Sequence, residues 1–259
     1  MSVVLNITEG LRMINDETKR KLRELKLYEL IVAIEINEKT SAWLEKSFDD
    51  KFQIITDYLY QEKYNKSIKM LIRRAGFRIA KAEVHNLFFD RRGLDKNKIM
   101  ELATCQYLSR STSIIIQGFT GSGKTYLACA LGREACKQRV KVRYVRMPDL
   151  LIEYDEEKTI HGNAKRLIKR YGGYGLLIID EWLMNEASDE ELHLIMEIIE
   201  KRYDCHSTIF CTQYKKENWH ERLGGGVLAD AIMDRIIHNA VSVETGELNM
   251  REFCSKQGL

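Results

Sequence analysis

The sequence predicts an α/β protein whose parallel sheet carries helices on both faces, preceded by a small helical domain. Five short apolar stretches alternate with segments of helical periodicity between residues 113 and 243. Strands that alternate with helices form parallel sheets, because each helix returns the chain to the same end of the sheet at which the previous strand began. The first 62 residues show no such strands, and their apolar residues recur at helical spacing.

Length and composition exclude several classes of protein. The chain has 259 residues, of which 44% are apolar and 31% charged, with one Pro and a net charge of +3. These values are typical of a folded globular protein. The six Cys form no CxxC pair and no zinc-ligand spacing, so we expect reduced, buried thiols. No apolar run is long enough to span a bilayer and no export signal is seen, which predicts a cytoplasmic protein without a membrane partner.

Residues 1–65 form the predicted helical domain. Residues 1–62 carry a net charge of −3, and Asp16 and Glu17 suit the positive end of a helix dipole. Apolar residues follow at steps of three and four: Leu22, Leu25, Tyr28 and Val32. A second helix is expected over about 41–62. Such a domain is typical of a packing or oligomerisation module.

A strongly basic stretch follows. Residues 63–98 contain 11 Lys or Arg against three acidic residues, a net charge of +8. Clustered basic charge is the usual footprint of a nucleic-acid contact, and Arg73 and Arg74 are candidate DNA contacts within it. The alternative is a solvated helix face whose charges meet acidic neighbours elsewhere in the fold.

The second predicted domain spans residues 66–259. Strands are expected over 113–118, 141–146, 175–180, 207–212 and 240–243. Helices are expected over 124–138, from Pro148, over 188–202 and over 228–238. Pro148 suits a first helical turn, where its missing N–H is not needed. Ser188 and Glu191 have the spacing of a capping box.

Residues 118–125 match the phosphate-loop pattern GxxxxGK[ST] at every fixed position. The loop follows an apolar strand and precedes a helix, which is the context that the pattern requires. Its glycines permit the backbone to turn N–H groups toward a phosphate chain, at the positive end of the following helix. Lys124 can reach the β- and γ-phosphates of ATP, and the Thr125 hydroxyl can ligate Mg²⁺. The nucleotide-binding candidates are Gly118, Thr120, Gly121, Ser122, Gly123, Lys124, Thr125 and Tyr126.

Two acidic residues follow the third apolar strand. Asp180 ends that strand, so it lies at the edge of the sheet where ligands bind, and it is the second candidate ligand of Mg²⁺. Glu181 comes directly after it, as expected of a base that polarises an attacking water. The alternative for Glu181 is an ordinary surface acid.

Further candidates lie toward the C-terminus. Thr212 and Gln213 end the fourth strand, where a polar pair can face the γ-phosphate, although a simple turn would also fit. Arg235 is expected on the surface of a helix, where it could insert into the ATP site of a neighbouring subunit. The alternative is a local ion pair with Asp234 or Asp230. Arg251 is a weaker candidate phosphate contact.

The C-terminal run resembles that of a known family. Residues 211–213, 218–220, 228–240 and 249–251 are similar to the signature "SQ…WH…ADAILDRLVHNA…MR" of the IstB-type helper ATPases of insertion-sequence transposition. These are relatives of the DnaC and DnaI helicase loaders within the AAA+ superfamily. Residues 91–95 and 101–105 also resemble the family's approach to the first strand.

The resemblance implies a five-stranded AAA+ P-loop NTPase that hydrolyses ATP with Mg²⁺ and assembles as an ATP-dependent homo-oligomer on DNA. It implies a sensor at Thr212 or Gln213, an arginine finger at Arg235 and a second sensor at Arg251. Family partners are double-stranded DNA, bound with little sequence preference, and a transposase of the retroviral-integrase type. The chain departs from the family at Phe119, where many members have Pro, and at Trp182, where Gly is frequent. Cys211 and Thr212 stand where Thr-Ser is common, and the tail after Val243 is too short for a helical lid.

These observations predict an ATP-gated, DNA-binding switch. ATP between subunits would stabilise an oligomer, which would lay basic side chains along DNA phosphates. Besides the two basic residues named above, the candidate contacts are Lys165, Arg166, Lys169 and Arg170. Three alternatives remain open: a helicase loader of the DnaC/DnaI type, a non-hydrolysing nucleotide-binding adaptor, and a small-molecule kinase.

Overall fold

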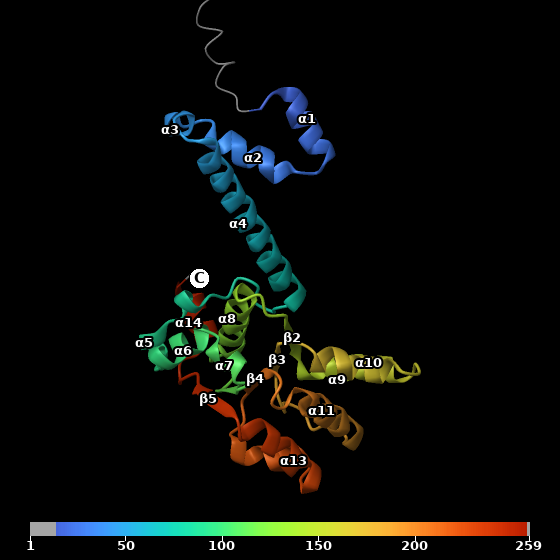
Figure 1. The fold of residues 1–259 in the computed structure, drawn as a ribbon. Helices are drawn as coiled ribbons and strands as arrows, with labels where there is room; N and C mark the ends of the chain where they lie inside the picture. Colours follow the sequence, from blue (N-terminus) through green and yellow to red (C-terminus); the bar gives the residue numbers. More distant parts are fainter. Residues whose placement is uncertain (1–13, 258–259) are drawn as a thin grey trace, which may run out of the picture. The chain divides into compact units, whose positions relative to one another are not determined.

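The computed structural model describes residues 14–257. The chain divides into two compact units, one up to Lys69 and one from Met70 onward (Figure 1). The division falls within one long helix, α4 (Phe48–Ala75). Over residues 14–257 we find no helix that is both long and apolar enough to cross a membrane.

The N-terminal unit is helical, but its first helices differ from the predicted pattern. Its elements are α1 (Asp16–Glu24), α2 (Tyr28–Asn37), α3 (Ser41–Leu44) and the first part of α4. The chain turns between α1 and α2 at Lys26, which has φ +60°. This turn breaks the predicted apolar stripe, so that Leu25, Tyr28 and Val32 are exposed. The core of the unit is formed instead by Ala33, Ile34, Trp43 and Ile55.

The predicted helix over 41–62 is wrong at both ends. The Ser47 hydroxyl accepts a hydrogen bond from the Asp50 N–H at 3.1 Å, and this cap begins α4 at Phe48. The helix then continues to Ala75, because no Pro or Gly interrupts it. It ends where Gly76 adopts φ +70°, the left-handed conformation that terminates many helices.

The second unit contains a five-stranded sheet, which confirms the predicted fold class. The strands are β1 (Ser113–Gln117), β2 (Val142–Arg146), β3 (Leu176–Asp180), β4 (Ser207–Thr212) and β5 (Ala240–Glu244). All neighbouring pairs are parallel, and the order across the sheet is β2-β3-β4-β1-β5. Each strand lies within one residue of its predicted range at either end.

Successive side chains of β1 pack into two different cores, one on each face of the sheet. Ile114 and Ile116 in β1 pack in the same core as helix α8 (Lys124–Lys137), whereas Ile115 packs in the other core. Successive side chains of a strand point to opposite faces. Because all three residues are fully buried, the strand needs apolar residues throughout.

The remaining helices form the two outer layers. The first core contains side chains from α6 (Lys96–Ala103), α7 (Gln106–Ser109) and α8. The second contains side chains from α9 (Met147–Lys158), α10 (Asn163–Gly172), α11 (Asp189–Arg202), α12 (Trp219–Arg222) and α13 (Gly226–Ile237). The short elements η1 (Val84–Asn86), α5 (Phe89–Arg92) and η2 (Lys216–Asn218) lie in connections. After β5, the described chain contains one further helix, α14 (Met250–Gln257).

Two smaller expectations have different outcomes. Ser188 forms the predicted capping box: the Ser188 N–H donates to Glu191 at 2.7 Å, and the Glu191 N–H donates to the Ser188 hydroxyl at 3.4 Å. The expectation that all six cysteines are buried is wrong for Cys205, which is exposed, and for Cys254, which is partly exposed. Cys205 follows the end of α11 in the turn before β4, where the chain is at the surface.

Candidate nucleotide site

The phosphate loop connects the carboxyl end of β1 to the N-terminus of α8. Gly121 and Gly123 adopt φ +88° and +87°, conformations that favour glycine and curl the loop. The Lys124 ammonium donates to the carbonyls of Gly118 at 2.8 Å and Phe119 at 2.9 Å. Burial lowers the pKa of Lys124 from its ordinary value. The loop therefore holds a partly desolvated positive charge against two of its own backbone carbonyls.

Asp180 lies beside the loop at the end of β3. One of its oxygens, Oδ2, accepts hydrogen bonds from the Thr125 hydroxyl and from the Tyr144 hydroxyl, both at 2.7 Å. Burial, followed by the charge of Asp180, raises the pKa of Tyr144. Thr125 and Asp180 thus present oxygen ligands next to one another, which is the donor set that Mg²⁺ prefers.

Glu181 projects from the same edge of the sheet. Its backbone adopts φ +58°, and its N–H donates to Asp180 Oδ1 at 2.9 Å. The carboxylate lies between two guanidinium groups, those of Arg78 at 3.3 Å and Arg146 at 3.5 Å. Arg146 ends β2 and is the register partner of Asp180. The side chain of Glu181 is 22% exposed, so the carboxylate can meet both solvent and these two arginines.

These groups share one cavity of about 420 Å³. Its lining includes Lys124, Asp180, Glu181, Gln213 and Arg251. The side-chain oxygen Oε1 of Gln213 accepts a hydrogen bond from the Thr120 hydroxyl at 2.8 Å, which links the end of β4 to the phosphate loop.

Thr212 has a different environment from Gln213. It is buried, and its hydroxyl donates to the Trp182 carbonyl at 3.2 Å and accepts from the Tyr214 N–H at 3.1 Å. Of the predicted sensor pair, the structure therefore brings Gln213 to the cavity, whereas the Thr212 side chain forms hydrogen bonds with the backbone.

The C-terminal tail folds back onto the same loop. The Met250 N–H donates to the Gly121 carbonyl at 2.8 Å, and Phe253 packs edge-on against Phe88 with ring centroids 5.2 Å apart. This tail places the exposed Arg251 at the cavity of its own chain. A second cavity of about 570 Å³ adjoins the loop, and Phe88, Tyr126 and Met250 line it.

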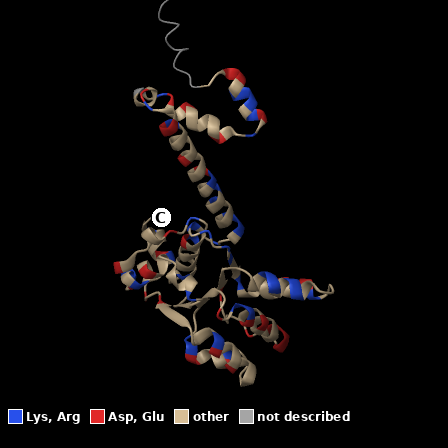
Figure 2. Cartoon of the chain, viewed as in Figure 1, with Lys and Arg blue, Asp and Glu red and all other residues tan. Residues whose placement is uncertain are grey.

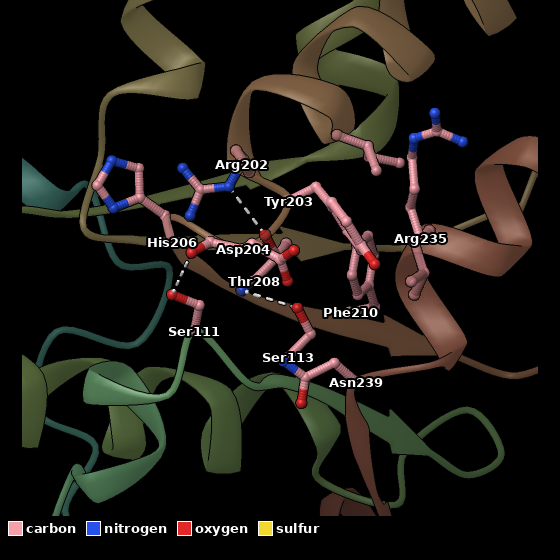
Figure 3. A pocket seen from close by; sticks show the side chains of 12 residues that line it. Ser111, Ser113, Arg202, Tyr203, Asp204, His206, Thr208, Phe210, Arg235 and Asn239 are labelled. Atoms are coloured by element: carbon pink, nitrogen blue, oxygen red, sulfur yellow. Dashed lines mark hydrogen bonds between the residues drawn. The ribbon is translucent and has the colours of Figure 1, made fainter.

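Arg235 lies near the amino ends of the strands, on the side of the sheet opposite the phosphate loop. Figure 3 shows it with Ser113 and Thr208, residues at the amino ends of β1 and β4, around a small pocket. A five-residue strand is about 15 Å long, so Arg235 is distant from the phosphate loop of its own chain. It forms an ion pair with Glu200 of α11, and not the local pair with Asp234 or Asp230 that the sequence left open. Its side chain is 27% exposed.

The six candidate DNA contacts are all exposed. Arg73 and Arg74 lie in the last turn of α4, and the other four lie on α10, where Figure 2 shows Lys and Arg along the helix. Arg170 pairs with Glu153, and Arg166 donates to the side chain of Asn163 at 3.3 Å. The remaining α10 candidates, Lys165 and Lys169, are exposed cations on the same helix.

Sequence reasoning missed several residues of the site. Tyr144 lies in the middle of β2 and Arg146 ends that strand; Tyr144 contacts Asp180 and Arg146 contacts Glu181. The position of Arg146 at the carboxyl end of a predicted parallel strand is a signal that could have found it, whereas Tyr144 carries no such signal. Arg78 and Thr245 carry no such signal, because they come from a connection and a turn whose paths depend on tertiary packing.

Comparison with known families gives a match over most of the chain. The family described as IstB-like ATP binding protein matches residues 20–257. The chain belongs to this family. An insertion sequence ATP-binding protein of Sinorhizobium fredii (strain NBRC 101917 / NGR234) is 37% identical over 160 residues, which is 62% of this IstB-like chain and 64% of that relative. The match thus spans slightly less than two thirds of that relative's length.

A second relative and a solved structure are also similar to this IstB-like chain. The ATP-binding protein of insertion sequence IS232 from Bacillus thuringiensis subsp. berliner is 29% identical over 216 residues, which is 82% of this chain and 86% of that protein. The crystal structure of DnaI superposes with a TM-score of 0.55 and 21% identity, covering 66% of this chain and 91% of DnaI. This structural likeness establishes the AAA+ P-loop fold.

Proposed function

We propose that this IstB-like protein hydrolyses ATP, binds duplex DNA in its ATP-bound form and assists a transposase during insertion-sequence transposition. The observation that carries the proposal is the shared cavity, where the phosphate-loop lysine, a carboxylate suited to Mg²⁺ and a candidate base lie together. A protein that only stored a nucleotide would not need the third of these groups. Family membership supports the link to insertion sequences.

The chemistry follows from the positions of the side chains. Lys124 binds the terminal phosphates of ATP, and the loop N–H groups orient them. Thr125 and Asp180 would hold Mg²⁺, whose charge offsets that of the β- and γ-phosphates. Glu181 accepts a proton from the attacking water. Gln213, held by Thr120, is positioned to sense the γ-phosphate.

ATP also joins subunits in this proposal. The pocket of one subunit faces Arg235 of the next, whose position at the opposite edge of the sheet suits a contact between chains better than one within a chain. Assembly repeats the exposed basic residues of α4 and α10 along the oligomer. Lys and Arg contacts with DNA phosphates give affinity without sequence preference.

The partner in transposition is a transposase of the retroviral-integrase type. Support comes from the family match and from relatives whose names place them in insertion sequences. The likeness to the DnaI structure is compatible with this reading, since it reflects a common fold and does not specify a helicase.

DNA binding across a salt series, with ATP, ADP or no nucleotide, tests the proposal. We expect tight binding of duplex DNA with ATP only, and a linear fall of log K with log salt concentration, because phosphate contacts release counterions. Lys124→Ala should abolish the difference between ATP and no nucleotide. Equal affinity of the wild-type protein in all three nucleotide states would refute the ATP gate, and an affinity that does not depend on salt would refute the phosphate contacts.

A further inference from the structure

Arg92 is a buried charge outside the site described so far. It is the last residue of α5 and is 4% exposed. Within residues 14–257 no carboxylate lies within ion-pair distance of its guanidinium, and its Nε has no hydrogen-bond partner. Buried charges in proteins are normally paired, because burial disfavours the charged form. Burial lowers the pKa of Arg92 to about 10, so the group is still positively charged at neutral pH.

The side chain of Arg92 contacts the back of the phosphate loop. Its Nη2 donates to the Ser122 carbonyl at 2.5 Å. The carbonyl and N–H of a trans peptide point in opposite directions, and no cis peptide bond is present in the described chain. A hydrogen bond that holds the Ser122 carbonyl toward Arg92 therefore turns the Gly123 N–H the other way, toward the inside of the loop.

The fit around Arg92 is close on two sides. A Cβ atom at Gly123 would lie 2.9 Å from Arg92 Nη2, and one at Gly246 would lie 1.6 Å from the Arg92 carbonyl oxygen. Both glycines have positive φ. The guanidinium of Arg92 thus packs against the phosphate loop at Gly123, while its backbone packs against the turn after β5 at Gly246.

A second contact fixes the same loop residue. The fully buried Thr245 hydroxyl donates to the Ser122 hydroxyl at 2.6 Å. Arg92 holds the backbone of Ser122 and Thr245 holds its side chain. Of the two, only Arg92 also brings a charge, and that charge lacks a counter-ion within the described chain.

We propose that Arg92 is a positioning residue for nucleotide binding, which fixes the orientation of the peptide between Ser122 and Gly123 before the nucleotide binds. Its charge, which has no counter-ion within the described chain, then favours the binding of ATP over that of ADP. A triphosphate on the loop supplies the negative charge that Arg92 lacks, and it supplies more of it than a diphosphate does. Electrostatic attraction is strong in a partly desolvated site. The proposal rests on ATP binding, and not on hydrolysis or DNA binding.

Equilibrium binding of ATP and of ADP to the full chain, without DNA, tests the proposal. Arg92→Gln should weaken ATP binding about tenfold or more and ADP binding clearly less, so that the preference for ATP falls. Arg91→Gln is the matched control, since Arg91 is an exposed neighbour with the same charge, and both affinities should stay within about twofold of the wild type. A loss of equal factor for ATP and ADP would mean a merely structural role and would overturn the proposal, as would unchanged affinities.

Arg92→Lys keeps the test decisive if the glutamine variant does not fold. Lysine retains the charge but cannot reproduce the guanidinium geometry. We expect both nucleotides to bind more weakly while the ATP preference is retained, and we expect faster amide hydrogen exchange over residues 118–125 in the nucleotide-free variant. Loss of the ATP preference, or unchanged exchange in the loop, would contradict the proposal. A wild-type protein that binds neither nucleotide would instead refute the nucleotide site itself.

Discussion

At the scale of single residues, the site depends on how Asp180 is held. The residue is 2% exposed, and its carboxylate accepts hydrogen bonds from Thr125 and Tyr144. Glu181, one residue later, is partly exposed and meets two arginines instead. Adjacent carboxylates thus have different environments, which suits one for holding a cation and the other for exchanging a proton with water.

Glu181→Gln tests the role of the candidate base. Glutamine has nearly the same shape but cannot accept a proton, so we expect phosphate release to fall by about 10²-fold or more while ATP binding is retained. Phosphate release and equilibrium nucleotide binding are the two measurements. Glu186→Gln, at an exposed acid nearby, should leave both unchanged. A variant that hydrolyses ATP at the wild-type rate would show that Glu181 is not the base.

Tyr144→Phe tests the support of Asp180. The substitution removes a hydrogen bond to a buried carboxylate, which typically costs about 2 kcal/mol of stability. Urea unfolding of the nucleotide-free protein, followed by tryptophan fluorescence, measures the change. Tyr154→Phe is the control, because its hydroxyl contacts the exposed Glu190 at 3.3 Å, and its effect should be close to zero. Equal effects of the two substitutions would contradict the expectation.

At the scale of elements, the ends of helices and strands determine where functional groups lie. β1, β3 and β4 end at the same edge of the sheet, so the residues that follow them converge on one cavity. The loop before α11 then carries the chain away from this edge, and the capping box at Ser188 begins that helix.

Ser188→Ala tests the contribution of this cap. Alanine cannot accept the hydrogen bond from the Glu191 N–H, so we expect a loss of about 1 kcal/mol in unfolding free energy. Denaturant unfolding measures the loss. Ser188→Thr retains a hydroxyl and should lose much less. ATP hydrolysis should be unchanged in both variants, and a large catalytic defect would mean that α11 has a role beyond packing.

At the scale of the whole molecule, the position of Arg235 makes a prediction about assembly. If Arg235 completes the site of a neighbour, two inactive variants can repair one another. A Lys124→Ala subunit still offers its Arg235, and an Arg235→Ala subunit still offers an intact phosphate loop. We expect each variant alone to hydrolyse ATP at least tenfold more slowly than the wild type, and an equimolar mixture to regain part of the activity.

The control for this mixture is a chain that carries both substitutions. Mixed with Arg235→Ala, it should restore nothing, because it lacks the arginine that the active site needs. Loss of the exposed pair with Glu200 should cost at most about 1 kcal/mol, so Arg235→Ala should remain folded. No recovery in the first mixture would place the action of Arg235 within its own subunit or outside catalysis.

Much of the second unit, from Met70 onward, could be predicted, because its signals are local. A buried parallel strand needs a continuous apolar run, a phosphate loop needs glycines at fixed spacing, and a capping box needs Ser and Glu three residues apart. The helix boundaries of the N-terminal unit were harder to predict. Its apolar residues fit a helical period, but a turn at Lys26 and a cap at Ser47 decided where the helices begin and end.

The sequence by itself determined the fold class, the phosphate loop and the acidic pair, since each depends on neighbours in the chain. Only the tertiary structure decided which distant groups surround them: Tyr144 against Asp180, two arginines against Glu181, Arg92 behind the loop and Arg235 at the far edge of the sheet. The physical reason is that a side chain's charge and hydrogen bonds depend on what packing brings within a few ångströms, and packing joins residues that the sequence separates.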